Sequence, residues 1–299
     1  MENSLLGIKM KKILVIGSEG YLGRVLVPFL KERKYSVFDI DMGFYSDTKY
    51  HIDYGHIPSF NGYDTIILLA GHSSPSLCEK YKTASFQNNV VNFFNLLPKL
   101  KPHQRLLYAS SASVCNGLAN ACEDDQLKAP ISHYDMQKQV IEKIASVAEC
   151  ETVGMRFGTI GGYSPNPRLD SVINSLYHDA MNKGEITVSN GDNFRSYLGM
   201  NDACKAIERL IEVGNPHKIY NIASDTSTIN YIGDKISELT GAKINKVKGS
   251  NNYSFWVNSQ RINDIVKLTD TIESICAGMG DMPKFDKSIY NRNTNLFKY

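Results

Sequence analysis

The sequence predicts an α/β protein built around a doubly wound parallel sheet. In its first half, short β-branched runs alternate with longer helical stretches, and a glycine-rich turn directly follows the first run. This alternation indicates parallel strands joined by helices, and such sheets bind ligands at the carboxyl ends of their strands. With 299 residues, the chain can bury a sizeable core as one large domain or as two unequal lobes around a cleft.

The expected elements of the first half follow one another closely. They are a strand in KKILVIG (11–17), a helix at about 21–34, strands in YSVFDID (35–41) and DTIILLAG (64–71), a helix near 84–97, a strand in RLLYASS (105–111) and a helix at about 134–148. After about residue 156 the alternation becomes irregular, beginning with the loop GGYSPNPR. We therefore expect a leader (1–10), a sheet domain (mainly 11–160) and a smaller α/β lobe (mainly 161–299), some segments of which return to the sheet.

Charge and composition argue against several classes of protein. The formal net charge is +2, from 33 basic and 31 acidic residues without a basic run, so nucleic acid is a poor candidate partner. The apolar runs are far shorter than the ~20 residues of a membrane-spanning helix, and the N-terminus has no secretory signal pattern. Six dispersed cysteines without a C-x-x-C pair fit a reducing compartment without structural zinc. We therefore expect a cytoplasmic protein that binds neither a membrane nor a metal.

Three glycines mark a candidate dinucleotide site. Gly17, Gly20 and Gly23 directly follow an apolar strand and open a helix, with G-x-x-G-x-x-G spacing. Glycines let the backbone approach a pyrophosphate, whose charge is met by amide groups at the helix N-terminus. The alternative is a glycine-rich turn that binds no ligand.

Asp41 ends the second strand and indicates which dinucleotide is bound. A carboxylate at this distance from the glycines accepts hydrogen bonds from both adenosine ribose hydroxyls and repels a 2′-phosphate, which favours NAD over NADP. Asp39 has the opposite side-chain parity on the strand and is the alternative for this role. Arg24 is a point in favour of NADP, but no second basic residue follows Asp41.

Tyr134 and Lys138 form a candidate acid/base pair. Their i, i+4 spacing places both on one face of a helix. A nearby ammonium group lowers the pKa of a phenol, which can then exchange a proton with a substrate hydroxyl. A Y-x-x-x-K spacing alone is weak, but SSASV (110–114) ends an upstream strand with hydroxyls that can hydrogen-bond the reacting oxygen.

Together these motifs resemble the extended short-chain dehydrogenase/reductase family, in its NAD-dependent nucleotide-sugar epimerase/dehydratase branch. The resemblance covers nearly the whole chain. It rests on GSEGYLG (17–23), Asp41, IDYGH (52–56), LLAGHSS (68–74), QNNV (87–90), SSASV, Tyr134 with Lys138, RFGTIGG (156–162), RSYLGMNDACKAI (195–207) and YNIAS (220–224). It implies a Rossmann-type sheet with a smaller substrate lobe, and NAD as the cofactor.

The resemblance also implies roles for individual residues. Tyr134 corresponds to the acid/base, Lys138 to its pKa modifier and nicotinamide-ribose ligand, and Ser111 to the hydroxyl that orients the substrate, with Ser110 as the alternative. Asp53 corresponds to an adenine-side acid, Gly71 allows close approach of the cofactor, and Asn89 supports the site by hydrogen bonds. The implied cofactor-binding set is Gly17, Gly20, Tyr21, Leu22, Gly23, Asp41, Asp53, Ala70, Gly71, Asn89, Tyr134 and Lys138.

The implied substrate is a nucleotide-diphosphate sugar. Arg195 corresponds to the arginine that grips the diphosphate, and Asn174 to a nucleotide-side ligand. Arg168 is a further contact or a solvated loop charge. Trp256 and Arg261 lie in a segment that can close over the nucleotide, although Trp256 can equally be a core residue. The substrate-binding set is Ser111, Thr159, Arg168, Asn174 and Arg195.

Two positions restrict the reaction. Ala112 and Ser113 stand where 4,6-dehydratases have Asp and Glu, and decarboxylating relatives also have Glu at the position of Ser113. Reductases that epimerise C3 and C5 use a cysteine there and a histidine where Ser164 stands, and Cys115 is displaced by two residues. Hydride transfer at one carbon remains, most often C4, by a 4-epimerase or a 4-dehydrogenase/reductase.

Two other functions stay open, and so does the oligomeric state of the protein. One is reduction of a small non-nucleotide ketone or alcohol. The other is a non-enzymatic dinucleotide sensor, against which intact Ser111, Tyr134 and Lys138 count. Thr159 and the sequence V-C-N at 114–116 depart from the family pattern near the substrate, which suggests an unusual sugar. Relatives commonly dimerise through two long helices, here 84–97 and 134–148, and commonly serve surface polysaccharide construction.

Overall fold

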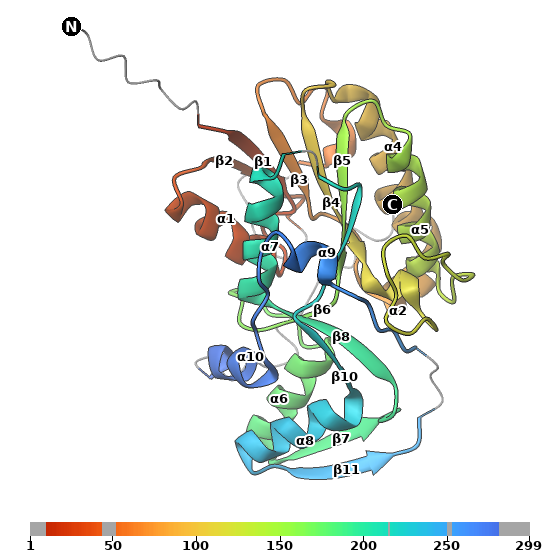
Figure 1. Ribbon diagram of the computed structural model, residues 1–299, viewed down its shortest axis with the longest axis vertical. Helices are drawn as coiled ribbons and strands as arrows, with labels where there is room; N and C mark the ends of the chain where they lie inside the picture. The colour runs from red at the N-terminus through yellow and green to blue at the C-terminus, as the bar shows by residue number, and fades with distance from the viewer. Residues whose placement is uncertain (1–9, 44–51, 215, 250–252, 281–299) are drawn as a thin grey trace, which may run out of the picture.

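A six-stranded parallel sheet forms the larger part of the molecule (Figure 1). The computed structural model describes residues 10–43, 52–214, 216–249 and 253–280, so the expected leader lies outside the described residues apart from Met10. In spatial order the strands are β2 (Ser36–Ile40), β1 (Lys12–Ile16), β3 (Thr65–Leu68), β4 (Arg105–Ser111), β5 (Glu151–Phe157) and β9 (Ile219–Ile222). All neighbours pair in parallel, which confirms the doubly wound sheet.

Helices cover both faces of this sheet (Figure 1). Successive side chains of β1 point to opposite faces, so Ile13 and Val15 enter one core and Leu14 and Ile16 the other. The first core is closed by α1 (Gly23–Glu32) and α7 (Met200–Glu212). The second is closed by a π-helical turn (Gln87–Val91), α4 (Asn92–Leu96) and α5 (His133–Ser146), and α3 (Lys82–Phe86) directly precedes this turn.

The strand order creates a switch point at the carboxyl end of β1. From β1 the chain passes to β2 on one side and then returns to β3 on the other side. The turn after β1 therefore faces the turn after β3, and a crevice opens between them. The helix expected at about 21–34 begins only at Gly23 because residues 17–22 form this turn, and it ends at Glu32, before Lys34 takes a left-handed φ of 63°.

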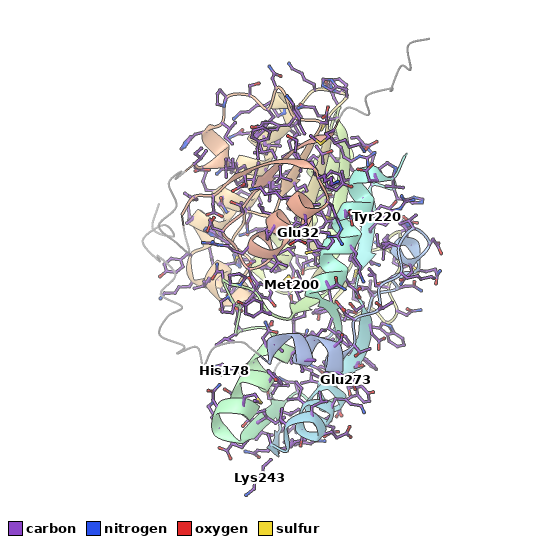
Figure 2. All side chains as sticks on the ribbon, turned by 90° about the vertical axis from the view of Figure 1, so that its left-hand side faces the viewer. Glu32, His178, Met200, Tyr220, Lys243 and Glu273 are labelled. Atoms are coloured by element: carbon purple, nitrogen blue, oxygen red, sulfur yellow. The ribbon has the colours of Figure 1, made fainter. Side chains whose placement is uncertain are left out.

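The second half builds a smaller lobe beneath the carboxyl edge of the sheet (Figure 1). Its strands are β6 (Thr159–Gly161), β8 (Phe194–Gly199) and β10 (Asp225–Thr228) in one sheet, and β7 (Glu185–Ser189) with β11 (Lys243–Val247) in another. Its helices are α6 (Val172–Lys183), α8 (Ile229–Thr240) and α10 (Ile272–Met279). They enclose a third core around Ile173, Ile186 and Ile232. Figure 2 shows Met200 between this lobe, which carries His178 and Glu273, and the sheet region, which carries Tyr220.

Short helical segments complete the described fold. These are α2 (Pro75–Lys80), α9 (Gln260–Asn263) and 3-10 turns at Tyr54–His56, Leu97–Lys99 and Ala112–Cys115. Within the described ranges, the helices are all too short or too polar to cross a membrane.

Candidate active site

A cavity of about 600 Å³ lies between the carboxyl edge of the sheet and the smaller lobe. Its wall brings together nearly all of the residues singled out by sequence. These are Gly17, Gly20, Tyr21, Leu22, Gly23, Asp41, Asp53, Ala70, Gly71, Ser110, Ser111, Tyr134, Lys138, Thr159, Arg168 and Arg195. Asn89 and Asn174 lie behind the wall, since both are buried and neither lines the cavity.

The glycine turn is shaped by close backbone contacts. Gly17 has a φ of +94°, and a Cβ on it would lie 2.5 Å from the backbone nitrogen of Ala70. A Cβ on Gly23 would lie 2.2 Å from the carbonyl oxygen of Gly17. A Cβ can therefore not be accommodated at either position, and the N-terminus of α1 is held against the switch point, where the positive end of the helix dipole favours an anion.

Asp41 is fixed at the end of β2. Its Oδ2 accepts a hydrogen bond from the Glu19 amide at 2.9 Å, and its Oδ1 accepts one from the Gly43 amide at 2.9 Å. Asp39, the alternative, pairs instead with Lys31 on α1 and does not line the cavity. Arg24 pairs with Glu19. This arrangement favours a ligand with free ribose hydroxyls over one with a 2′-phosphate.

Asn89 supports the turn after β3 from behind. Its Oδ1 accepts a hydrogen bond from the His72 amide at 2.7 Å, and its Nδ2 donates to the His72 carbonyl at 3.1 Å and to Gln137 Oε1 at 2.7 Å. Gly71 lies directly in front of Asn89, where a Cβ would approach its Oδ1 to 3.1 Å. Asp53, at the cavity wall, accepts a hydrogen bond from the Gly55 amide at 2.8 Å.

Tyr134 and Lys138 project from the first turns of α5. The helix begins after Ser132, whose Oγ accepts a hydrogen bond from the Asp135 amide at 3.0 Å and so caps the N-terminus. Lys138 Nζ donates to the Ala109 carbonyl at 2.7 Å and lies 5.7 Å from the centroid of the Tyr134 ring. Ser111 lies beside Tyr134, since its side chain acts on the pKa of the phenol. The acid/base pair and the strand-end hydroxyl are thus adjacent.

The expected lowering of the Tyr134 pKa is wrong. Burial raises the pKa of Tyr134 to about 12, against the lowering effects of Ser111 and Arg168. Burial also lowers the pKa of Lys138 to about 8. Desolvation therefore outweighs the charges around the phenol, which the helical spacing alone could not indicate.

Ser110 and Ser111 point in different directions. Ser110 Oγ donates to Glu142 Oε1 at 2.6 Å, and Glu142 in turn pairs with the buried Arg156 at 2.8 Å. Ser111 instead interacts with Tyr134 and, at 2.8 Å, with Ser113 Oγ. This geometry favours Ser111 over Ser110 as the hydroxyl next to a substrate.

Arg195 brings a charge with an unused donor into the cavity. Its guanidinium lies 4.7 Å from the Phe255 ring centroid and 5.3 Å from that of Tyr253. Its buried Nη1 has no hydrogen-bond partner among the described residues, and burial lowers its pKa. Arg168, by contrast, pairs with Asp170 at 2.7 Å and donates to the Ser73 carbonyl at 3.0 Å. Arg195 is the better placed of the two to receive an anion.

Three expected nucleotide contacts are not brought into the cavity. Asn174 is fully buried: its Nδ2 donates to Tyr21 Oη at 2.9 Å and to the Arg168 carbonyl at 2.8 Å, while its Oδ1 accepts from the Gly162 amide. Trp256 stacks on Phe194 outside the cavity. Arg261 pairs with Glu123 and Asp124. Asn174 thus positions Tyr21 and the Arg168 loop from behind.

Sequence reasoning missed a polar cluster under the substrate end of the cavity. Ser113 Oγ donates to Asp135 Oδ1 at 2.5 Å, and Tyr253 Oη donates to the same oxygen at 2.9 Å. Ser113 and Tyr253 line the cavity, whereas Asp135 lies beneath it. Asp135 directly follows Tyr134 in the sequence, so an acidic residue beside the candidate acid/base was a usable signal. Tyr253 comes from a distant segment and had no such signal.

The cysteine-based and metal-based alternatives find no support in the geometry. Cys115 is fully buried, and burial raises its pKa to about 11. Ser164 Oγ donates to the Tyr21 carbonyl at 2.7 Å. Within the described part of the chain, no three His, Cys, Asp or Glu side chains are grouped in a way that could hold a metal ion.

A glycine turn at the switch point of a parallel sheet, next to a Tyr–Lys pair, defines a Rossmann-type dinucleotide enzyme. Residues 13–223 match the NAD dependent epimerase/dehydratase family, and the chain belongs to that family. A Methanocaldococcus jannaschii protein, provisionally named a UDP-glucose 4-epimerase, is 22% identical over 254 residues, which are 77% of this chain and 82% of that protein.

Two solved structures share the fold at low identity. TunA, described as a NAD dependent NDP-hexosamine 5,6-dehydratase involved in tunicamycin biosynthesis, superposes with a TM-score of 0.79 at 17% identity, over 90% of this chain and 96% of that chain. A UDP-glucuronic acid 4-epimerase from Bacillus cereus, in complex with UDP-glucuronic acid and NAD, gives 0.77 at 19% identity, over 91% of this chain and all of that chain (100%).

The protein is thus an enzyme of a NAD-dependent family, and its residues fit the cofactor. A Cβ at Gly17 or Gly23 would meet backbone, so only main chain borders the crevice there, as the close approach of a pyrophosphate requires. Asp41, held by two backbone amides beside this turn, has the acceptor chemistry that a ribose requires.

Proposed function

We propose that the protein is a NAD-dependent 4-epimerase or 4-dehydrogenase/reductase of a nucleotide-diphosphate sugar. One observation carries the proposal: Arg195, whose buried Nη1 has no partner among the residues that the structure describes, lines the same cavity as Tyr134 and Ser111. A cation with a free donor fits a diphosphate, and a phenol beside a hydroxyl fits a carbinol carbon. The two ends of such a substrate are therefore both accounted for.

The side chains divide the work at the reacting carbon. NAD, when bound, would supply the acceptor and donor of a hydride at the sugar carbon. Tyr134 takes the hydroxyl proton and gives it back, and Ser111 orients the substrate at the strand end. Lys138 keeps a positive charge close to the phenol, although burial makes this charge easier to lose. Tyr134 is only 8% exposed, so bulk water has little access to the transferred proton.

The surroundings of Tyr134 support redox chemistry at one carbon over elimination. Removal of water needs an acid and a base beside the substrate in addition to the tyrosine. Ala112 is fully buried and apolar, and the Ser113 hydroxyl is bonded to Asp135. The likeness to a 5,6-dehydratase is at 17% identity and carries the fold alone.

The proposal is tested by a substrate screen with a matched variant. The purified protein with NAD is offered UDP-, GDP-, CDP- and dTDP-sugars, and NADH formation and inversion at C4 are followed. Accumulation of NADH indicates a dehydrogenase, and inversion without accumulation indicates an epimerase. Tyr134→Phe should lower turnover by about 10²- to 10⁴-fold, because it removes the proton-transferring group.

The matched control is Tyr220→Phe, which changes a buried tyrosine outside the cavity. It should leave turnover unchanged. If no nucleotide sugar reacts with the wild type, or if Tyr134→Phe remains as active as Tyr220→Phe, the proposed function is wrong.

We also propose that the protein forms a homodimer through α3, α4 and α5. The helical stretch of α3 and α4 packs beside α5 and leaves Phe86 and Phe94 exposed, at 39% and 59%. Exposed aromatic rings on adjacent helices are typical of an interaction surface.

A further inference from the structure

Asp135 gathers three hydroxyl groups on one buried carboxyl. It is 1% exposed and lies in the first turn of α5. Its Oδ1 accepts hydrogen bonds from Ser113 Oγ at 2.5 Å and from Tyr253 Oη at 2.9 Å, and its Oδ2 accepts one from Ser132 Oγ at 2.7 Å. No lysine, arginine or histidine of the described residues acts on this carboxyl. Hydroxyl donors therefore stabilise its charge in place of a cation.

These contacts continue to the candidate acid/base. A carboxylate can only accept, so the Ser113 proton points to Asp135. At the 2.8 Å contact between Ser111 Oγ and Ser113 Oγ, Ser111 is then the donor. Ser111 in turn lies beside the phenol of Tyr134, since it acts on the pKa of Tyr134 and both side chains line the cavity. A chain of hydroxyl groups thus runs from Tyr134 through Ser111 and Ser113 to Asp135, and its last two links are hydrogen bonds.

We propose that Asp135 holds the proton removed from the substrate hydroxyl, which reaches it from Tyr134 through the hydroxyls of Ser111 and Ser113. This inference rests on the proposed function. During oxidation the C–H bond gives its hydride to NAD and the O–H bond gives its proton to Tyr134. Each hydroxyl then passes one proton on and receives another, so that Asp135 becomes a neutral acid and the chain is otherwise unchanged. Reduction runs the same transfers backwards.

The environment of Asp135 suits a proton acceptor of this kind. Burial raises its pKa, while the hydrogen bonds from Ser113, Ser132 and Tyr253 lower it. The ionisable groups around it are Tyr134 on its own helix, Tyr253 from the segment opposite and Cys78 on α2. Lys138, the other proton-carrying group near Tyr134, donates to the Ala109 carbonyl, away from this chain.

The first arm of the test needs neither cofactor nor substrate. The carboxyl carbon of Asp135 is followed by ¹³C nuclear magnetic resonance as a function of pH in the protein alone. The wild-type pKa should lie above the ordinary range for Asp. Ser113→Ala and Tyr253→Phe should each raise it further, because each removes a donor to the charged form. An Asp135 pKa unchanged by Ser113→Ala would overturn the hydrogen-bond chain.

The second arm measures turnover with the sugar found in the screen. Asp135→Asn and Ser113→Ala should each lower kcat about tenfold or more, with a smaller effect on KM, because proton transfer is interrupted. Ser113→Thr retains the hydroxyl and should restore kcat. Equal losses in Ser113→Ala and Ser113→Thr, or no loss in Asp135→Asn, would overturn the proposal.

The matched control is Asp202→Asn. Asp202 is also a fully buried acid in the first turn of a helix, and it accepts a hydrogen bond from Ser224 Oγ at 2.7 Å, outside the cavity. This variant should lower the melting temperature and leave kcat and its pH profile unchanged.

An infrared band of a protonated carboxyl should form when sugar is mixed with the NAD-loaded wild type, and should be missing in Asp135→Asn. If no sugar reacts with the wild type, the proposed function fails, while the first arm still decides whether the chain exists.

Discussion

Arg195 illustrates how one side chain can serve binding at the expense of stability. Burying a charge without a full set of hydrogen bonds costs free energy, and Nη1 of this guanidinium is buried without a partner in the described part of the chain. The rings of Tyr253 and Phe255 recover part of this free energy by cation–π contact. Such an arrangement is expected where the missing partner is a bound anion.

Replacing Arg195 by methionine therefore has opposite effects on binding and stability. Arg195→Met should weaken binding of the nucleotide sugar by about 2 kcal/mol or more, a rise in KM of about thirtyfold. The melting temperature should stay equal or rise, because an incompletely bonded buried charge is removed. Steady-state kinetics and thermal unfolding check both effects.

Arg24→Met is the control, since this exposed arginine pairs with Glu19 near the surface. It should change KM little. An unchanged KM in Arg195→Met would instead support a small substrate without a phosphate group.

At the scale of elements, the turn between β1 and α1 joins the cofactor crevice to the core. A Cβ on Gly23 would meet the backbone of Gly17 and Ser18, and neither can rotate away as a side chain could. The helix would have to move away from the crevice, while Leu26 and Leu30 hold it against the sheet.

Gly23→Ala should therefore lower the free energy of unfolding by about 1–3 kcal/mol and weaken NAD binding about tenfold or more. Chemical denaturation and isothermal titration with NAD measure the two effects. Gly278→Ala, in a helix with open space around the new methyl group, should be neutral or slightly stabilising. Equal behaviour of the two variants would show that Gly23 is not constrained.

Local patterns predicted the elements well, and most of the candidate site residues that they singled out line one cavity. The alternation of strands and helices and the glycine turn are encoded in short windows, so the parallel sheet followed from them. The pKa direction of Tyr134 could not follow, because it depends on burial by segments far apart in the chain. For the same reason Asn174 turned out to be a support behind the wall, and Tyr253 was missed.

At the scale of the whole molecule, assembly depends on the surface formed by α3, α4 and α5. Phe94→Glu should convert the proposed homodimer to a monomer, because it buries a charge at an apolar contact. Light scattering over a range of protein concentrations measures the mass. Met181→Glu is the matched control, since Met181 is 56% exposed on α6 in the smaller lobe. A wild type that is monomeric at all concentrations would contradict the proposed dimer.

The last strand of the parallel sheet has a consequence for how the protein is made. β9 pairs with β5, although the smaller-lobe strands β6, β7 and β8 lie between them in the chain. While the protein is being synthesised, β5 leaves the ribosome well before β9. Until β9 follows, the edge of β5 that will pair with β9 has unpaired backbone hydrogen-bonding groups. The nascent chain is therefore most prone to pair with other chains during this interval. The interval ends only when Ile219–Ile222 has emerged and can pair with β5.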